Sequence, residues 1–256
     1  MKGQELFVAQ EAVIRRIWGD ADCVLFIFAA SAAEFAVHKA VDWLYFTGKL
    51  PDDPLGRLFS TVDYARKIIF SDRRSALDAI DTITQIHASV EKKRGRRIPG
   101  HAYRDVLYML IDYSVRAFEL LERPLSANEK ADIYGVFRQV GDRMQIPHLP
   151  ADYAAWLPDR EKSLRGNYLA GDFTADLFAR YRRHLGPGRY LLLRNVQAML
   201  VPAAISTPLA LRPSAVMRKL FSVYKICRRH KKNRVVRGFF MPREYRHRIK
   251  ALDVPR

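Results

Sequence analysis

The chain has 256 residues, of which 49% are hydrophobic and 11% aromatic, so it can bury a sizeable core and does not have the composition of a disordered protein. Its formal net charge is +17 and its pI about 10.1, which favours anionic lipid, nucleic acid or an acidic protein as a neighbour. Residues 225–256 hold 12 Lys/Arg and 2 Asp/Glu, a net charge of +10, which leaves +7 for the other 224 residues. Most of the excess charge therefore belongs to the C-terminal end.

The cysteines and the apolar runs indicate in which cellular compartment the protein is expected. Cys23 and Cys227 lie far apart and form no CxxC or Cys/His cluster, which disfavours a structural zinc site and a disulfide framework. The first 18 residues lack the apolar centre of a signal peptide. The apolar run 23–33 is too short to span a bilayer, and 190–211 is interrupted by arginine and proline. We expect a cytoplasmic protein that is at most peripheral at a membrane.

Helical periodicity runs through most of the chain, and the alternating patterns of strands are scarce. We predict one all-α, multi-helix domain over residues 1–224, followed by a basic C-terminal tail over residues 225–256. The predicted helices span, in chain order, 4–18, 22–46 (one or two helices), 55–70, 73–92, 103–121, 127–144, 151–157, 159–170, 173–184, 187–200 and 213–229.

Three local signals mark where helices begin. Residues 48–54, GKLPDDP, contain two prolines and no periodicity, and are predicted to form a loop. Ser71 or Asp72 is expected to cap the helix that follows. Ser126, with Glu129 three residues further on, has the spacing of a capping box.

One histidine, His87, lies inside an apolar helical stripe. Ile80, Ile83, His87 and Val90 are three, four and three residues apart, which predicts that the imidazole lies on the core face. An imidazole in an apolar wall can ligate a metal or haem iron. A core histidine that is hydrogen-bonded to a carbonyl is the commoner case, and the spacing alone favours it. Among the other six histidines, His38 is the strongest competitor because it also lies in an apolar helix.

A cation and a hydroxyl form a second candidate pair. Arg57 and Thr61 are four residues apart, which predicts one shared face of helix 55–70. An arginine stays charged and orients a polar oxygen ligand, and a threonine hydroxyl one turn further on can donate to the same ligand. Pairs at this spacing are common, so the spacing alone favours a surface arginine and an incidental threonine.

Other enzyme signatures are missing from the sequence, which contains no P-loop, GxGxxG, HExxH or GxSxG motif. Glu34, Asp42 and Asp112 fall in otherwise apolar helices and are candidates for buried acids, but nothing in the sequence pairs them. In the basic tail, cations are interleaved with Phe239 and Tyr245. Such a tail can bind phosphates or an anionic membrane, and a solvated tail is the commonest alternative.

Several segments, in chain order, resemble the MpaB and rubber-oxygenase (latex-clearing protein) catalytic-domain family. They are FAASAAEFAVHKAVDWLYFTGKLPDDPLGRLFST, YARKIIFSD, ITQIHASV, YRDVLYMLIDYSVRAFELLERPLSANEKADIYGVFRQVGDRM and QIPHLPADYAAWL, followed by a late apolar stretch rich in proline. Each motif is modest, but their order and spacing over residues 20–225 make the match fairly specific.

The resemblance implies an all-α fold with a globin-like core that holds haem b. His87, in IHASV, resembles the proximal iron ligand, and Arg57 and Thr61, in RLFST, resemble residues of the distal side. The rubber-cleaving enzymes have a lysine just before that threonine, where this chain has Ser60. This difference counts against a rubber-type distal ligand and against polyisoprene as the substrate.

The leading hypothesis is a haem b-dependent oxygenase, with His87 as the axial ligand of the iron and Arg57 and Thr61 as catalytic and cofactor-binding residues. It would use dioxygen to cleave a carbon–carbon double bond in an apolar, isoprenoid- or lipid-like substrate, with the basic tail at an anionic membrane and nucleic acid a less suitable partner. Two alternatives stay open: a non-catalytic helical protein that binds membrane or nucleic acid through its tail, and a relative that binds haem without turnover. The sequence predicts no particular oligomeric state.

Overall fold

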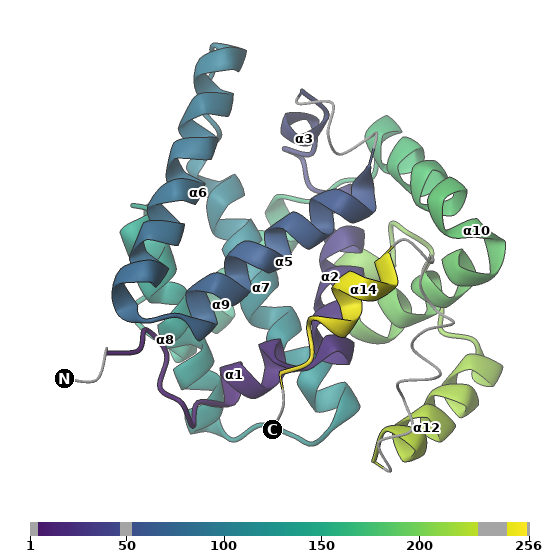
Figure 1. The fold of residues 1–256 in the computed structure, drawn as a ribbon. Helices are drawn as coiled ribbons and strands as arrows, with labels where there is room; N and C mark the ends of the chain where they lie inside the picture. Colours follow the sequence, from purple (N-terminus) through teal and green to yellow (C-terminus); the bar gives the residue numbers. More distant parts are fainter. Residues whose placement is uncertain (1–4, 47–52, 230–244, 255–256) are drawn as a thin grey trace.

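The computed structural model describes residues 5–46, 53–229 and 245–254, and within these ranges it contains helices and isolated bridges but no strand (Figure 1). The predicted all-α fold is therefore confirmed. Two buried helices, α2 (Ala21–Ala36) and α7 (Gly100–Leu121), pack against each other in the centre. The others are α1 (Val13–Trp18), α3 (Asp42–Phe46), α5 (Pro54–Phe70), α6 (Arg73–Arg94), α8 (Ala127–Arg143), α9 (Tyr153–Gly166), α10 (Asp172–Leu200), α11 (Ala203–Ser206), α12 (Ala215–Arg229) and α14 (Arg246–Lys250).

The predicted helix caps are confirmed. The carboxylate of Asp72 accepts the amide of Ser75 at 3.0 Å, so Asp72 is the residue that caps α6. The Ser126 hydroxyl accepts the amide of Glu129 at 3.2 Å, and the Glu129 carboxylate accepts the amide of Ser126 at 2.9 Å, which completes the capping box of α8. Hydrogen bonds from Arg123 lower the pKa of Glu129 to about 2.

One predicted helix is shorter than expected, and the span 22–46, predicted as one or two helices, forms two. The helix predicted over 4–18 begins at Val13, because the segment before it runs beside the α5–α6 connection, where the Glu5 carbonyl accepts the amide of Arg73 at 2.8 Å. The break in the span 22–46 follows Ala36, where residues 37–39 pair with residues 167–169. A backbone that hydrogen-bonds to a distant segment cannot also make its own helical bonds, so these tertiary contacts override the local periodicity.

Proline interrupts one of the later helices but not the other. Two helices were predicted around Pro158, but α9 runs through it as a single helix. Proline removes one helical hydrogen bond, and the packing of α9 tolerates that loss. At Gly186 the backbone takes a φ of 74° just before Pro187, so α10 has two arms that match the two predicted helices. Positions 48–52 of the predicted loop lie outside the described residues, and Pro54 is the first residue of α5.

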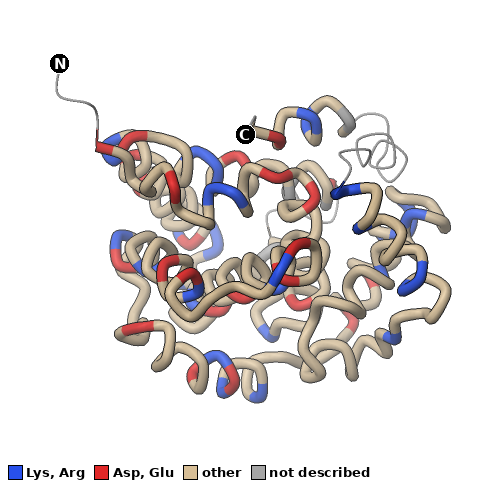
Figure 2. Tube along the Cα trace, turned by 90° about the horizontal axis from the view of Figure 1, so that it is seen from below, with Lys and Arg blue, Asp and Glu red and all other residues tan. Residues whose placement is uncertain are grey.

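Basic and acidic positions are interspersed along most of the chain trace (Figure 2), and one group of them is buried in the centre. Arg160 of α9 donates to the two carboxylate oxygens of Glu34 in α2 at 2.7 Å each, and to Asp112 of α7 at 3.1 and 3.2 Å. Tyr113 and Tyr168 each donate a further hydrogen bond of 2.5 Å to Glu34. Because these charges are removed from water, each needs its partner in place. The network therefore fixes α2, α7 and α9 relative to one another.

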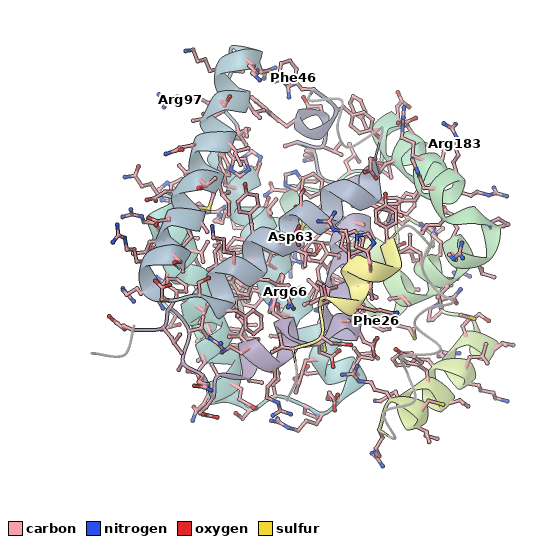
Figure 3. All side chains as sticks on the ribbon, viewed as in Figure 1. Phe26, Phe46, Asp63, Arg66, Arg97 and Arg183 are labelled. Carbon is pink, nitrogen blue, oxygen red and sulfur yellow. The ribbon has the colours of Figure 1, made fainter. Side chains whose placement is uncertain are left out.

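The described end of the chain packs against the helical body. Ile249 and Leu252 are buried, and Arg66 of α5 donates to the carbonyl oxygens of Trp18 and Leu252 at 2.6 Å each. Arg248 of α14 is paired with Asp63, and Figure 3 shows Asp63 and Arg66 on the side of α5 nearest α14. Residues 230–244 of the predicted tail, with His230 and Phe239, lie outside the described residues. The division of the chain at residue 225 stays a prediction.

We expect Arg160→Met to lower the free energy of unfolding by about 3–5 kcal/mol, because it leaves Glu34 and Asp112 buried without their cation. Urea unfolding followed by circular dichroism measures the change. Arg165→Met is the matched control, since Arg165 is exposed on the same helix and pairs with the exposed Glu161. Its effect should stay within about 0.5 kcal/mol. Equal effects of the two substitutions would contradict a structural role for the buried network.

Candidate functional site

The candidate residues lie on two consecutive helices, α5 and α6, joined by Ser71 and Asp72. The carboxylate of Asp53 caps the start of α5 by accepting the amide of Gly56 at 2.8 Å, and Pro54 occupies the first helical position. Gly95, with a φ of 67°, ends α6 in the left-handed conformation typical of helix ends. The two helices diverge from their connection, and α6 extends beyond the body of the molecule (Figure 1).

His87 lies on the side of α6 that faces the start of α7. Its ring is 5.1 Å from the ring of Tyr103, centroid to centroid, in an edge-on arrangement. The Tyr103 hydroxyl donates to Glu91, one turn beyond His87, at 3.1 Å, and burial together with this hydrogen bond raises the pKa of Tyr103 above its usual range. Tyr103 therefore holds this part of α6 against α7, and its ring packs against the imidazole of His87 and limits the orientation of that ring.

The predicted core position of His87 is only partly realised. Ile80 is fully buried, whereas Ile83, His87 and Val90 are half-buried. The Nδ1 atom of His87 is nevertheless shielded from solvent. The apolar stripe is therefore buried at Ile80 and becomes more exposed toward the C-terminal end of α6, and His87 lies in this more exposed part.

Arg57 and Thr61 lie on α5, the helix before α6. Arg57 is 13 residues before the end of α5, and His87 is 14 residues after the start of α6, so each is about 20 Å from the connection. Thr61 and Ser60 are half-buried. The side chain of Arg57 lies outside the part of the chain that the structure describes. The hairpin therefore brings the three predicted residues to neighbouring helices, with Arg57 and Thr61 one turn apart.

The far end of α6 is tied to α3. The guanidinium of Arg94 is 2.5 Å from the carboxylate of Asp42 and lies 4.0 Å from the centre of the Trp43 ring. Phe46 follows on α3 and is partly exposed at the mouth of the helix pair, where Figure 3 labels it. Asp42, one of the three candidate buried acids, is thus half-buried and pairs with Arg94.

His38, the alternative candidate for a metal ligand, is hydrogen-bonded within a separate buried polar cluster. Its Nε2 atom is 2.9 Å from Asp105, and its Nδ1 accepts the amide of Ala40 at 3.0 Å. Asp105 also accepts hydrogen bonds of 2.6 Å from Ser163 and from Asn167. Since both imidazole nitrogens of His38 are already used, this histidine is not available to a metal.

The buried polar contacts of Glu34, Asp112 and Asp105 were not predicted from the sequence, although one sequence pattern could have indicated them. Trp156, Arg160, Ser163 and Asn167 are four, three and four residues apart, which places them on one face of α9 and of the residue that caps its C-terminal end. Three of the four are polar, which is unusual for a face that contains a buried tryptophan. Such a pattern predicts polar partners on the facing helices, and these are Glu34, Asp112 and Asp105.

The structure thus defines an all-α protein with a half-buried histidine on one helix and two candidate hydrogen-bond donors on the helix before it. A model of the family described as "ER-bound oxygenase mpaB/B'/Rubber oxygenase, catalytic domain" matches residues 15–228. The chain belongs to this family, which is named for oxygenases. The comparisons with curated proteins and with solved structures find no match.

None of the helices in the described ranges has the length and apolar character needed to cross a bilayer.

We expect Asp105→Asn to lower the free energy of unfolding at pH 7 by about 2–3 kcal/mol, because three buried donors lose a charged acceptor. Burial would raise the pKa of Asp105, but hydrogen bonds from His38, Ser163 and Asn167 outweigh it, so the pKa is lowered. A carboxyl with a lowered folded-state pKa stabilises the fold above its unfolded-state pKa, about 3.9. That stabilisation is lost as pH falls through the folded-state value.

The difference between wild type and Asp105→Asn should therefore shrink as the pH falls below about 4. Chemical unfolding at several pH values measures it. Asp132→Asn, at an exposed position of α8, is the control and should stay within about 0.5 kcal/mol of wild type. A difference that persists unchanged into acid would show that the charge of Asp105 is not the cause.

Proposed function

We propose that this chain is a haem b-dependent oxygenase that cleaves a carbon–carbon double bond in an apolar, isoprenoid- or lipid-like substrate. The observation that carries the proposal is the position of His87, in a family whose members are named as oxygenases. This imidazole is half-buried in an apolar stripe, its Nδ1 is shielded from solvent, and Tyr103 fixes its edge. A surface histidine would have none of these features.

The donor chemistry of these residues fits a haem. Iron in haem takes an imidazole nitrogen as an axial ligand. His87 would hold the iron, and half-buried Ile83 and Val90 would contact the apolar macrocycle. When bound, haem supplies the iron at which dioxygen is activated.

Arg57 and Thr61 would serve the opposite side of the cofactor. A guanidinium and a hydroxyl one turn apart on α5 can donate hydrogen bonds to the same oxygen ligand. In a site that excludes water, such fixed donors stabilise developing negative charge far more than they do in solution. Ser60, which replaces the lysine of the rubber-cleaving enzymes, supplies a small neutral hydroxyl at that position and no second cation.

The overall reaction would be balanced with dioxygen as the only co-substrate. The carbon–carbon double bond breaks, and each of its carbons receives one oxygen atom to become a carbonyl, so no separate reductant is consumed. Apolar substrates of this class dissolve in membranes. The basic C-terminal tail would hold the enzyme at an anionic membrane surface, where the substrate concentration is highest.

We expect His87→Ala to abolish haem binding, because it removes the proposed iron ligand. Purified wild-type and variant chains are titrated with hemin, and the bound haem is measured from the Soret absorption and from iron content after gel filtration. His184→Ala, at an exposed position of α10, is the matched control and should bind as much haem as wild type.

Full haem retention by His87→Ala would sink the assignment of the ligand. A wild-type chain that takes up no hemin would instead favour the non-catalytic alternative. Circular dichroism of all three proteins confirms that the helical fold is the same, so that loss of haem is not a consequence of unfolding.

Arg57→Ala and Thr61→Val are each expected to weaken binding of fluoride to the ferric haem protein by about tenfold, because each removes a hydrogen bond to a bound anion. Haem content should be unchanged in both variants. Thr84→Val, at an exposed position of α6, serves as the control. Fluoride affinity equal to wild type in both variants would remove Arg57 and Thr61 from the distal side, whatever the identity of the organic substrate.

A further inference from the structure

The most strongly segregated helix surface in the described part of the chain is that of α12. Val216, Leu220, Val223 and Ile226 form a stripe at spacings of four, three and three, and they are between 56% and 66% exposed. We call these four residues the α12 stripe. Exposed aliphatic residues are ordinary when scattered singly, but a continuous stripe along one helix marks a surface that binds something.

The orientation of α12 is fixed by its opposite contacts. Arg228 is buried and donates to Asp20 and Asp22 at the start of α2 at 2.7 and 2.5 Å, and to Glu122 after α7 at 2.7 Å. The ring of Phe221 lies 5.8 Å from that of Phe26 on α2, which Figure 3 labels. These contacts hold one side of the helix on the body, so the stripe cannot rotate inward.

Three kinds of side chain divide the circumference of α12. At about 100° per residue, the α12 stripe is centred roughly 150° from the face that contains Phe221 and Arg228, so it lies on nearly the opposite side of the helix. Arg218 and Arg229, which are exposed, lie between these two faces, and the exposed Lys219 lies within the arc of the stripe, between Val223 and Ile226. An apolar face, a cationic face and low overall hydrophobicity are the features of helices that lie in the surface of a membrane.

The charge around α12 favours an anionic partner. The chain has no Asp or Glu between Asp176 and Glu244, a stretch of 67 residues. Between Asp172 and Arg229 there are 11 Lys/Arg and 2 Asp/Glu. Figure 2 shows the result, since blue positions outnumber red ones on the side that α10 and α12 form. The helix also lies at the periphery of the molecule, where a flat surface can reach it (Figure 1).

We propose that the α12 stripe inserts its aliphatic side chains into the interface of an anionic lipid bilayer, with Lys219 and the neighbouring arginines contacting lipid headgroups. The occupant is a membrane because the patch combines aliphatic side chains with a broad cationic surround, and the acidic residues beside α12 in the described part of the chain, Asp20, Asp22 and Glu122, are paired with Arg228. This proposal concerns a surface on α12 and is independent of the haem and of the basic residues after 229.

The test is co-flotation of the full-length chain with vesicles, made of phosphatidylcholine alone or mixed in equal parts with phosphatidylglycerol. Wild type should float with the anionic vesicles and much less with the neutral ones. The double variant Leu220→Gln/Val223→Gln should lose at least about tenfold in partitioning, because two inserted side chains become polar. The matched control, Leu157→Gln/Leu169→Gln, changes two exposed leucines elsewhere and should stay within about twofold.

A second variant, Arg218→Gln/Lys219→Gln, tests the electrostatic part. Each lost cation should weaken binding to anionic vesicles by about fivefold, with little effect on neutral ones. All four variant residues are exposed, so circular dichroism should show an unchanged fold.

The proposal is overturned if wild type fails to float with anionic vesicles, or if the stripe variant floats as well as wild type. It is also overturned if light scattering shows a wild-type dimer that the stripe variant converts to a monomer, since a second copy of the chain would then cover the stripe. Because vesicle binding is measured with or without haem, its failure is distinguishable from failure of the oxygenase proposal.

Discussion

The arrangement of the central helices depends on the guanidinium of Arg160, which neutralises Glu34 and Asp112 in the interior. Two carboxylates without a cation could not remain ionised there, because the cost of removing them from water exceeds the stability of most domains. The planar fork of arginine meets both acids at once, and Tyr113 and Tyr168 occupy further lone pairs of Glu34. One residue thus ties α9 to α2 and α7.

The candidate site depends on this frame through α7. The buried side of that helix carries Asp105 and Asp112, and its first turns carry Tyr103, which contacts His87 and Glu91 on α6. A fixed α7 therefore fixes the position of the imidazole. Beyond Glu91, the last residue of α6, Arg94, is held on Asp42 and Trp43, so the helix is supported at His87 and at its C-terminal end although it extends beyond the body.

Local features of the fold could be predicted from the sequence, whereas long-range pairings could not. Asp72, Ser126 and Glu129 act through neighbours three residues away, and their caps were predicted. Glu34 and Arg160 are 126 residues apart, and no periodicity relates one helix to another at that distance. The same limit explains why the sequence could not decide between one helix and two over residues 22–46, because the segment that pairs with residues 37–39 comes much later in the chain. At the site, spacing placed His87 on the inner side of α6 but overestimated its burial, because the stripe continues where α6 leaves the core.

The central claim is that the imidazole of His87 is the protein ligand of a haem iron, and resonance Raman spectroscopy of the ferrous, hemin-loaded chain tests it most directly. The account predicts an iron–histidine stretching band that shifts when the protein is grown with ¹⁵N-labelled histidine. A spectrum without that band, or one typical of a thiolate ligand from Cys23 or Cys227, would contradict it.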